Sequence, residues 1–113
     1  MPLDDTRTTP GYVCGRIIAA YELIAARVGK ELSLNDLSLT ATNPVYTHRL
    51  RAGLVCKALA RMREQNPQGV ARVEAYLSEL VARLDCFPER LDPEQQAEYV
   101  LGEAHQKVVG LPF

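Results

Sequence analysis

The chain carries its clearest fold signal in residues 66–84, NPQGVARVEAYLSELVARL. Asn66 is a good helix N-cap because its side chain accepts hydrogen bonds from first-turn amides, and Pro67 suits the next position because its missing N–H has no partner there. Apolar residues then recur at three- and four-residue steps, while Glu79 and Arg83 stand four residues apart on the polar side. The apolar positions are Val70, Val73, Leu77, Leu80, Val81 and Leu84. The stretch predicts an amphipathic helix that starts near residue 67.

The same N-cap and proline pair occurs three more times, as Thr9-Pro10, Asn43-Pro44 and Asp92-Pro93. Asp92 is also followed by Gln95, which predicts a capping box. Apolar residues at helical spacing follow the first and last of these pairs. They are Val13, Ile17, Ala20, Tyr21, Ile24 and Val28, and then Ala97, Val100, Leu101, Ala104 and Val108. We therefore expect further helices from about residues 10, 44 and 93, each with its apolar stripe turned to a common core.

These patterns predict an all-α protein, a bundle of four long helices. Residues 32–42 form either a short fifth helix capped by Ser33 or a packed loop. No segment alternates with a period of two, so no sheet is expected. With 113 residues the chain fits one domain. We predict a flexible N-terminal segment at residues 1–9 and a single helical domain at residues 10–113.

Motifs for catalysis, cofactors or export are absent from the sequence. The three cysteines, Cys14, Cys56 and Cys86, are widely separated and lack metal-ligand spacing, which is typical of free thiols in a reducing cytoplasm, each filling the core. A Cys/His pair drawn from Cys14, Cys56, His48 and His105 stays open as an alternative, but no catalytic motif accompanies it. The polar N-terminus is no signal peptide, and the apolar run 17–21 is too short for a membrane span. We expect a cytoplasmic protein that is neither an enzyme nor dependent on a cofactor.

The formal net charge of -1 conceals a division along the chain. Residues 1–63 carry nine basic and five acidic side chains, and residues 64–113 carry four basic and nine acidic ones. The segment 45–63 has five basic residues and no acidic residue. At about 100° per residue, its apolar side chains gather on one face and most of its cations on the other, with Gly53, Cys56 and Ala60 between them. Small residues among long cations leave room for a phosphate backbone to approach closely.

This basic helix, residues 44–64, predicts a nucleic-acid interface without sequence specificity, since no base-reading motif accompanies it. The candidate contacts are Arg49, Arg51, Lys57, Arg61 and Arg63, with Arg16 and Lys30 from outside the helix. Two alternatives stay open. Arg16 and Arg51 are each either a buried ion-pair member or a nucleic-acid contact. The whole basic face is either a nucleic-acid interface or a charge match for the acidic C-terminal helices, on this chain or on a partner protein.

Two stretches resemble the C-terminal helical region of the large subunit of type I-C CRISPR complexes. One is residues 12–20, YVCGRIIAA, with Glu22 and Ile24, and the other runs from Phe87-Pro88 and Leu91 through Glu94-Gln95 and Leu101-Gly102 to His105-Gln106-Lys107. In that family the region is also made from an internal start codon as a separate chain, the small subunit of the Cascade complex. The resemblance implies a noncatalytic helical subunit in antiviral defence, present in more than one copy. It would contact other copies, the large subunit and the backbone subunits that carry guide RNA, and help to hold target or displaced DNA.

Overall fold

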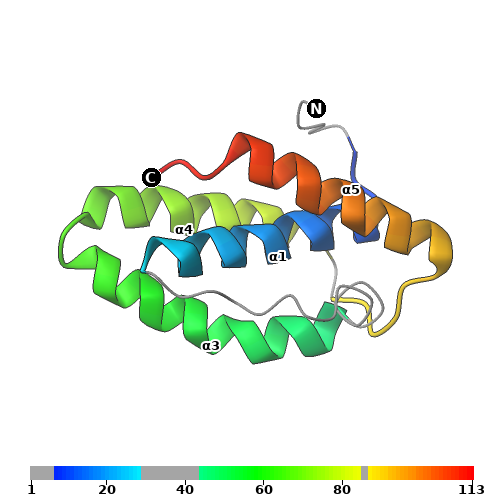
Figure 1. Cartoon of the computed structure of the whole chain (residues 1–113), viewed down its shortest axis with the longest axis horizontal. Helices are drawn as coiled ribbons and strands as arrows, with labels where there is room; N and C mark the ends of the chain where they lie inside the picture. The colour runs from blue at the N-terminus through cyan, green and yellow to red at the C-terminus, as the bar shows by residue number, and fades with distance from the viewer. Residues whose placement is uncertain (1–6, 29–43, 85–86) are drawn as a thin grey trace.

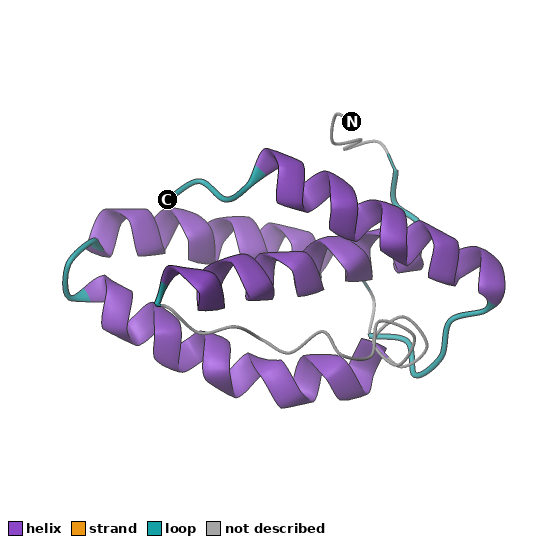
Figure 2. Cartoon of the chain, in the orientation of Figure 1, coloured by secondary structure: helices purple, strands orange, loops and turns teal. Residues whose placement is uncertain are grey.

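The computed structural model of the chain describes residues 7–28, 44–84 and 87–113, and it describes the side chains of all of these except 44–47 and 49–51. Within these ranges every regular element is an α-helix, and the remaining described residues are loops and turns (Figure 2). The predicted all-α bundle of four long helices is therefore confirmed. The possible short helix at residues 32–42 lies outside the described residues.

The four helices begin at the four prolines that follow N-cap residues. They are α1 (Pro10–Arg27), α3 (Pro44–Arg63), α4 (Pro67–Ala82) and α5 (Pro93–Val109). The side chains of Asn66 and Asp92 accept hydrogen bonds from the amides of Gly69 at 3.0 Å and Gln95 at 2.8 Å. These caps satisfy amides that the first helical turn leaves without a partner. All four predicted helix starts are confirmed.

Helix α1 is the centre of the bundle. It contacts α3, α4 and α5, and in Figure 1 it lies between α3 and α5 with α4 behind. Helices α1, α3 and α5 run in the same direction and α4 runs against them (Figure 1). Residues 11–21 of α1 are buried without interruption, so α1 is covered on all sides and not only along its predicted stripe. A helix that is apolar nearly all round is expected in such a central place.

The backbones of α1 and α5 approach each other closely at three glycines. A Cβ atom on Gly11 would overlap the carbonyl oxygen of Gln95, and one on Gly15 would overlap that of Tyr99. On α5, a Cβ atom on Gly102 would overlap the carbonyl oxygen of Tyr12. Small residues at four-residue spacing let two helices pack backbone to backbone. This contact, more than an apolar seam, fixes where α5 lies on α1.

The predicted orientation of α5 is wrong. Its stripe of Ala97, Val100, Ala104 and Val108 faces solvent, with Val100 46% and Val108 69% exposed, and only Leu101 is partly covered. The buried residues of the helix are Tyr99, Gly102, His105 and Gln106. The glycine contacts bring this second face against α1, where its polar side chains find hydrogen-bond partners. Helix α4 follows its prediction, because Val70, Val73 and Leu80 are buried, although Val81 remains 39% exposed.

Candidate nucleic-acid interface

Helix α3 presents its small and basic residues outward. Val55, Ala58 and Leu59 are buried against the bundle, as the spacing predicts. The exposed residues of the same stretch are Gly53, Leu54, Cys56, Lys57, Ala60, Arg61 and Arg63. We call Gly53, Cys56, Lys57, Ala60 and Arg61 the basic face. A Cβ atom on Gly53 would have no neighbour within 4 Å, so the described structure leaves the backbone open at this point.

A groove runs beside the basic face. It has a volume of about 240 Å³ and is lined by Val28, Leu54, Lys57, Ala58 and Arg61. Leu54, predicted for the apolar side, is 41% exposed because it forms part of this groove and not of the core. The groove has an apolar lining and two cationic side chains. Lys57 and Arg61 are four residues apart on one helix, where like charges repel by a few tenths of a kcal/mol unless an anion lies between them.

Arg63, a third candidate, is paired within the chain. Its Nη2 lies 2.7 Å from Oε1 of Glu74 on α4, and both side chains are about half exposed. An exposed ion pair of this kind contributes at most about 1 kcal/mol, so a phosphate could compete for the guanidinium. The pair also matches the alternative interpretation, in which basic and acidic helices of the chain neutralise each other.

Three candidates cannot be placed on this surface. Lys30 and the side chains of Arg49 and Arg51 lie outside the described residues. The two roles left open for Arg51 therefore remain open.

Arg16 lies in the interior of the bundle. It is 1% exposed, and its Nε donates a hydrogen bond to Oε1 of Gln106 at 3.0 Å, while Nη2 donates to the Tyr76 hydroxyl at 2.9 Å. Tyr76 in turn donates to the same Gln106 oxygen at 3.1 Å. Of the two roles that the sequence leaves open for Arg16, the structure favours the buried one, although the described partners are neutral oxygens. We do not retain Arg16 as a contact on the basic face.

Two tyrosines hold the two histidines. The hydroxyl of Tyr12 lies 2.7 Å from Nδ1 of buried His105, and that of Tyr21 lies 2.8 Å from Nδ1 of His48. Burial, with a smaller effect of nearby Cys56, raises the pKa of Tyr21 to about 12. These contacts give the histidines a packing role in the bundle.

The two described cysteines differ in environment. Cys14 is in the core as predicted, and burial raises the pKa of its thiol to about 12. Cys56 is exposed on the basic face, so its predicted place in the core is wrong. It lies on the outer side of α3, where none of the described helices packs over it.

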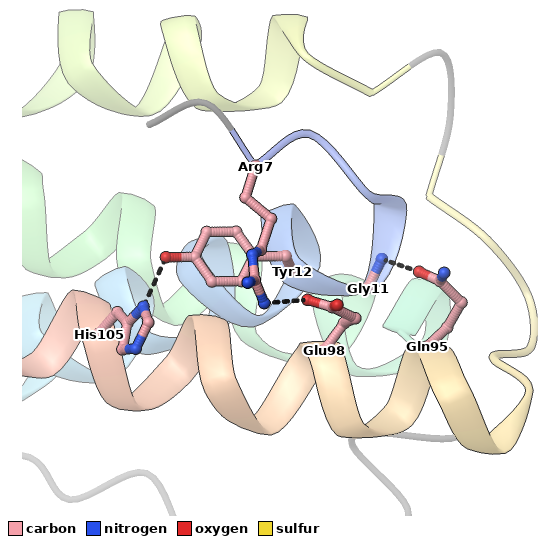
Figure 3. Close-up of polar contacts among 6 residues, drawn as sticks. All are labelled: Arg7, Gly11, Tyr12, Gln95, Glu98 and His105. Atoms are coloured by element: carbon pink, nitrogen blue, oxygen red, sulfur yellow. Dashed lines mark hydrogen bonds and ion pairs between the residues drawn. The ribbon is translucent and has the colours of Figure 1, made fainter. Parts of the chain in front are cut away.

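The N-terminal end of α1 is held by α5 in a way that the sequence did not indicate. Oε1 of Gln95 accepts a hydrogen bond from the Gly11 amide at 2.8 Å (Figure 3). Thr9, the expected cap, makes no side-chain cap bond. Arg7 lies over the Tyr12 ring and pairs with Glu98 at 3.0 Å (Figure 3). Residue 7 of the predicted flexible segment is thus fixed to α5, while residues 1–6 lie outside the described ranges.

Polar pairs between α1 and α5 join the two stretches that carry the family resemblance. Tyr12 contacts His105, Arg16 contacts Gln106, and Glu22 pairs with Lys107 at 2.8 Å. Burial alone would lower the pKa of Lys107, but the hydrogen bond and charge of Glu22, together with Glu103, raise it above its ordinary value. These residues hold the bundle together, and the only sequence signal for them was that resemblance.

Nearly the whole chain, residues 1–109, matches the family described as CRISPR-associated protein (Cas_Csd1). The chain belongs to this CRISPR-associated family. No curated protein sequence matches it. This Cas_Csd1 chain has no helix, within the described residues, that is long and apolar enough to cross a membrane. The same residues contain no cluster of three or more His, Cys, Asp or Glu side chains suited to a metal ion.

Proposed function

We propose that this Cas_Csd1 chain is a noncatalytic small subunit of a type I-C CRISPR surveillance complex in the cytoplasm. It contacts the backbone and large subunits and other copies of itself, and it helps to hold target or displaced DNA beside the guide RNA. The observation that carries the proposal is the basic face of α3, where Lys57 and Arg61 are exposed on a helix whose apolar side is buried. The family match supports the CRISPR context.

The basic face suits a phosphate backbone and not a particular base sequence. Gly53, Cys56 and Ala60 keep the helix surface low between the cations. Two contacted phosphates would make binding fall about tenfold between 50 mM and 200 mM salt. So small a number of contacts also makes binding by the isolated chain weak, which fits a subunit that acts within an assembly.

The test is DNA retention by the complete complex. We expect Lys57→Glu with Arg61→Glu to weaken retention of target DNA at low salt and to flatten its salt dependence, because two phosphate contacts are lost. The matched control is Arg72→Glu with Arg90→Glu, which changes the net charge equally at exposed positions off this face. Circular dichroism confirms that both variants are folded. If the first variant holds DNA as well as wild type, the interface is assigned to the wrong residues.

The second candidate function is a protein-only interaction module with complementary basic and acidic faces. The Arg63–Glu74 pair favours it, because it joins a basic and an acidic helix within the chain itself. This alternative predicts that the Lys57 and Arg61 variant loses a protein partner and keeps the DNA affinity of the complex. Co-purification of the chain with guide RNA and the other subunits would place its role inside the complex, as both proposals require. A chain that purifies without them would act elsewhere.

A further inference from the structure

The exposed stripe of α5 has the composition of a buried surface. Ala97, Val100, Ala104 and Val108 follow one another at three- and four-residue steps on the outward side of the helix. Solvent-facing helix sides are ordinarily polar. The outer side of α4 is mixed by comparison, because the polar Arg72, Glu74, Ser78 and Glu79 are exposed there among smaller apolar residues. We call the four apolar residues the α5 stripe.

The apolar residues of α5 face outward because the helix buries a different set of residues. The helix turns Gly102, His105 and Gln106 toward α1, and their contacts with Tyr12 and Arg16 fix its rotation. Rotating the helix to bury the valines would break these hydrogen bonds and force the backbones of the two helices apart. The stripe therefore stays outward in the folded chain, and another molecule must cover it if it is to be buried.

The charges around the α5 stripe indicate the chemistry of that molecule. Glu94 is exposed on one edge. On the other edge Lys107, 38% exposed, pairs with Glu103 and with Glu22 of α1, whose side chains are 12% and 9% exposed. The three carboxylates and one ammonium have a net formal charge of -2, and Glu94 is the most exposed of the carboxylates, so this surface disfavours a phosphate backbone and favours a cationic one. The same carboxylates oppose an isologous contact with the stripe of a second copy, because such a contact brings like charges together.

We propose that the α5 stripe is a docking surface for another protein subunit, one that presents an apolar surface edged by lysine or arginine. The inference rests on the proposed function, because it takes the partner from among the other proteins of the complex. It assigns the two sides of the molecule to different partners, since α5 and α3 lie on opposite sides of α1 (Figure 1). Protein binds the stripe and nucleic acid binds the basic face.

The test compares a double variant of the α5 stripe with a single control variant on α4, both in the reconstituted complex. Val100→Gln with Val108→Gln makes the stripe polar and leaves the helix intact, because glutamine is the better helix former and both valines are exposed. We expect its incorporation into the complex to fall by about tenfold or more, as when central apolar interface contacts are removed. Val81→Gln on α4 is the matched control and should incorporate like wild type.

A second pair of variants tests the charge of the partner. Glu94→Lys should weaken incorporation more at low salt than at high salt, because it turns an attraction into a repulsion. Glu89→Lys, an exposed position in the loop before α5, is the control. Light scattering of the isolated chain shows whether a second copy occupies the stripe: a dimer that the valine variant abolishes would overturn the assignment to another subunit.

The outcomes separate this inference from the proposed function. If the wild-type chain does not enter the complex, the proposed function fails. If wild type and the valine variant enter equally well, the proposed function stands and the docking surface is wrong.

Discussion

Arg16 of α1 and Gln106 of α5 are joined by a buried hydrogen bond of 3.0 Å between Nε and Oε1. The two residues are 90 positions apart in the chain. Gln106 also donates from Nε2 to the carbonyl oxygen of Gly110 at 2.8 Å, which ties the bond to the C-terminal end of α5. A charged group is thus built into the contact between α1 and α5.

We predict that Arg16→Met lowers the free energy of unfolding by about 2–3 kcal/mol, because it removes hydrogen bonds from a buried charged donor to one buried acceptor, Gln106, and one partly buried acceptor, Tyr76. Arg16→Lys should rescue little, since an ammonium cannot reproduce the two directed bonds of the guanidinium. Urea unfolding measures both. Lys57→Met is the control and should leave stability unchanged. If Arg16→Met keeps its stability and loses DNA binding instead, the role given to Arg16 is wrong.

We predict that Gly15→Ala is destabilising by about 1–3 kcal/mol, because its methyl group overlaps the Tyr99 carbonyl and overpacks the α1–α5 contact. Gly53→Ala is the matched control in a helix with open space at that position. It should stabilise the chain by up to about 1 kcal/mol through helix propensity. Thermal unfolding gives the two shifts, and shifts of the same sign would contradict the close approach of the two helices.

The ion pair of Lys107 with Glu22 predicts a pH dependence. Because the folded pKa of Lys107 is raised, its contribution is present below the unfolded pKa of about 10.4 and is lost as pH rises through the folded value. Lys107→Met should therefore cost about 1 kcal/mol at pH 7, a modest figure because the ammonium is partly exposed and screened. Urea unfolding between pH 7 and strongly alkaline pH should show the difference from wild type closing. A constant difference would mean that packing of the lysine chain, and not its charge, is what counts.

The cysteines should differ in reactivity toward iodoacetamide. We predict that Cys56 is alkylated in the folded chain at pH 8, because it is exposed, while Cys14 is protected by burial and by its raised pKa. Peptide mapping by mass spectrometry assigns the labelled site. In urea both should react at similar rates. Rapid labelling of Cys14 under native conditions would show that the core around α1 opens readily.

The sequence predicted those features that depend on neighbouring residues. The helix starts were readable because the residues that mark them adjoin the helix they begin: Asn66 and Asp92 cap α4 and α5, and Pro10 and Pro44 occupy the first position of α1 and α3. The outward direction of Lys57 and Arg61 was readable because α3 has one apolar face and one polar face. Helical spacing is sufficient for such features.

Features that depend on distant partners could not be read in this way. Hydropathy alone places Val100 inside and Gln106 outside, and the structure reverses both because Gln106 finds Arg16 and the backbones meet at Gly102. Cys56 was misplaced for a related reason, since a small residue on an outer face looks the same in sequence as one in the core. Buried polar groups are tolerated where partners exist, and the partners here are about 90 residues away.

The central place of α1 has a consequence for synthesis of the chain. Its glycine face can be covered only by α5, which is made last among the described helices. Until α5 has left the ribosome, α1 lacks its largest neighbour among the described helices, so α1 is made early in this stretch of chain and enclosed late. Such long-range closure slows folding and leaves apolar surface open to aggregation in the meantime. Ribosome-bound chains halted before residue 93 should be sensitive to protease within α1, and those released after residue 109 should be resistant.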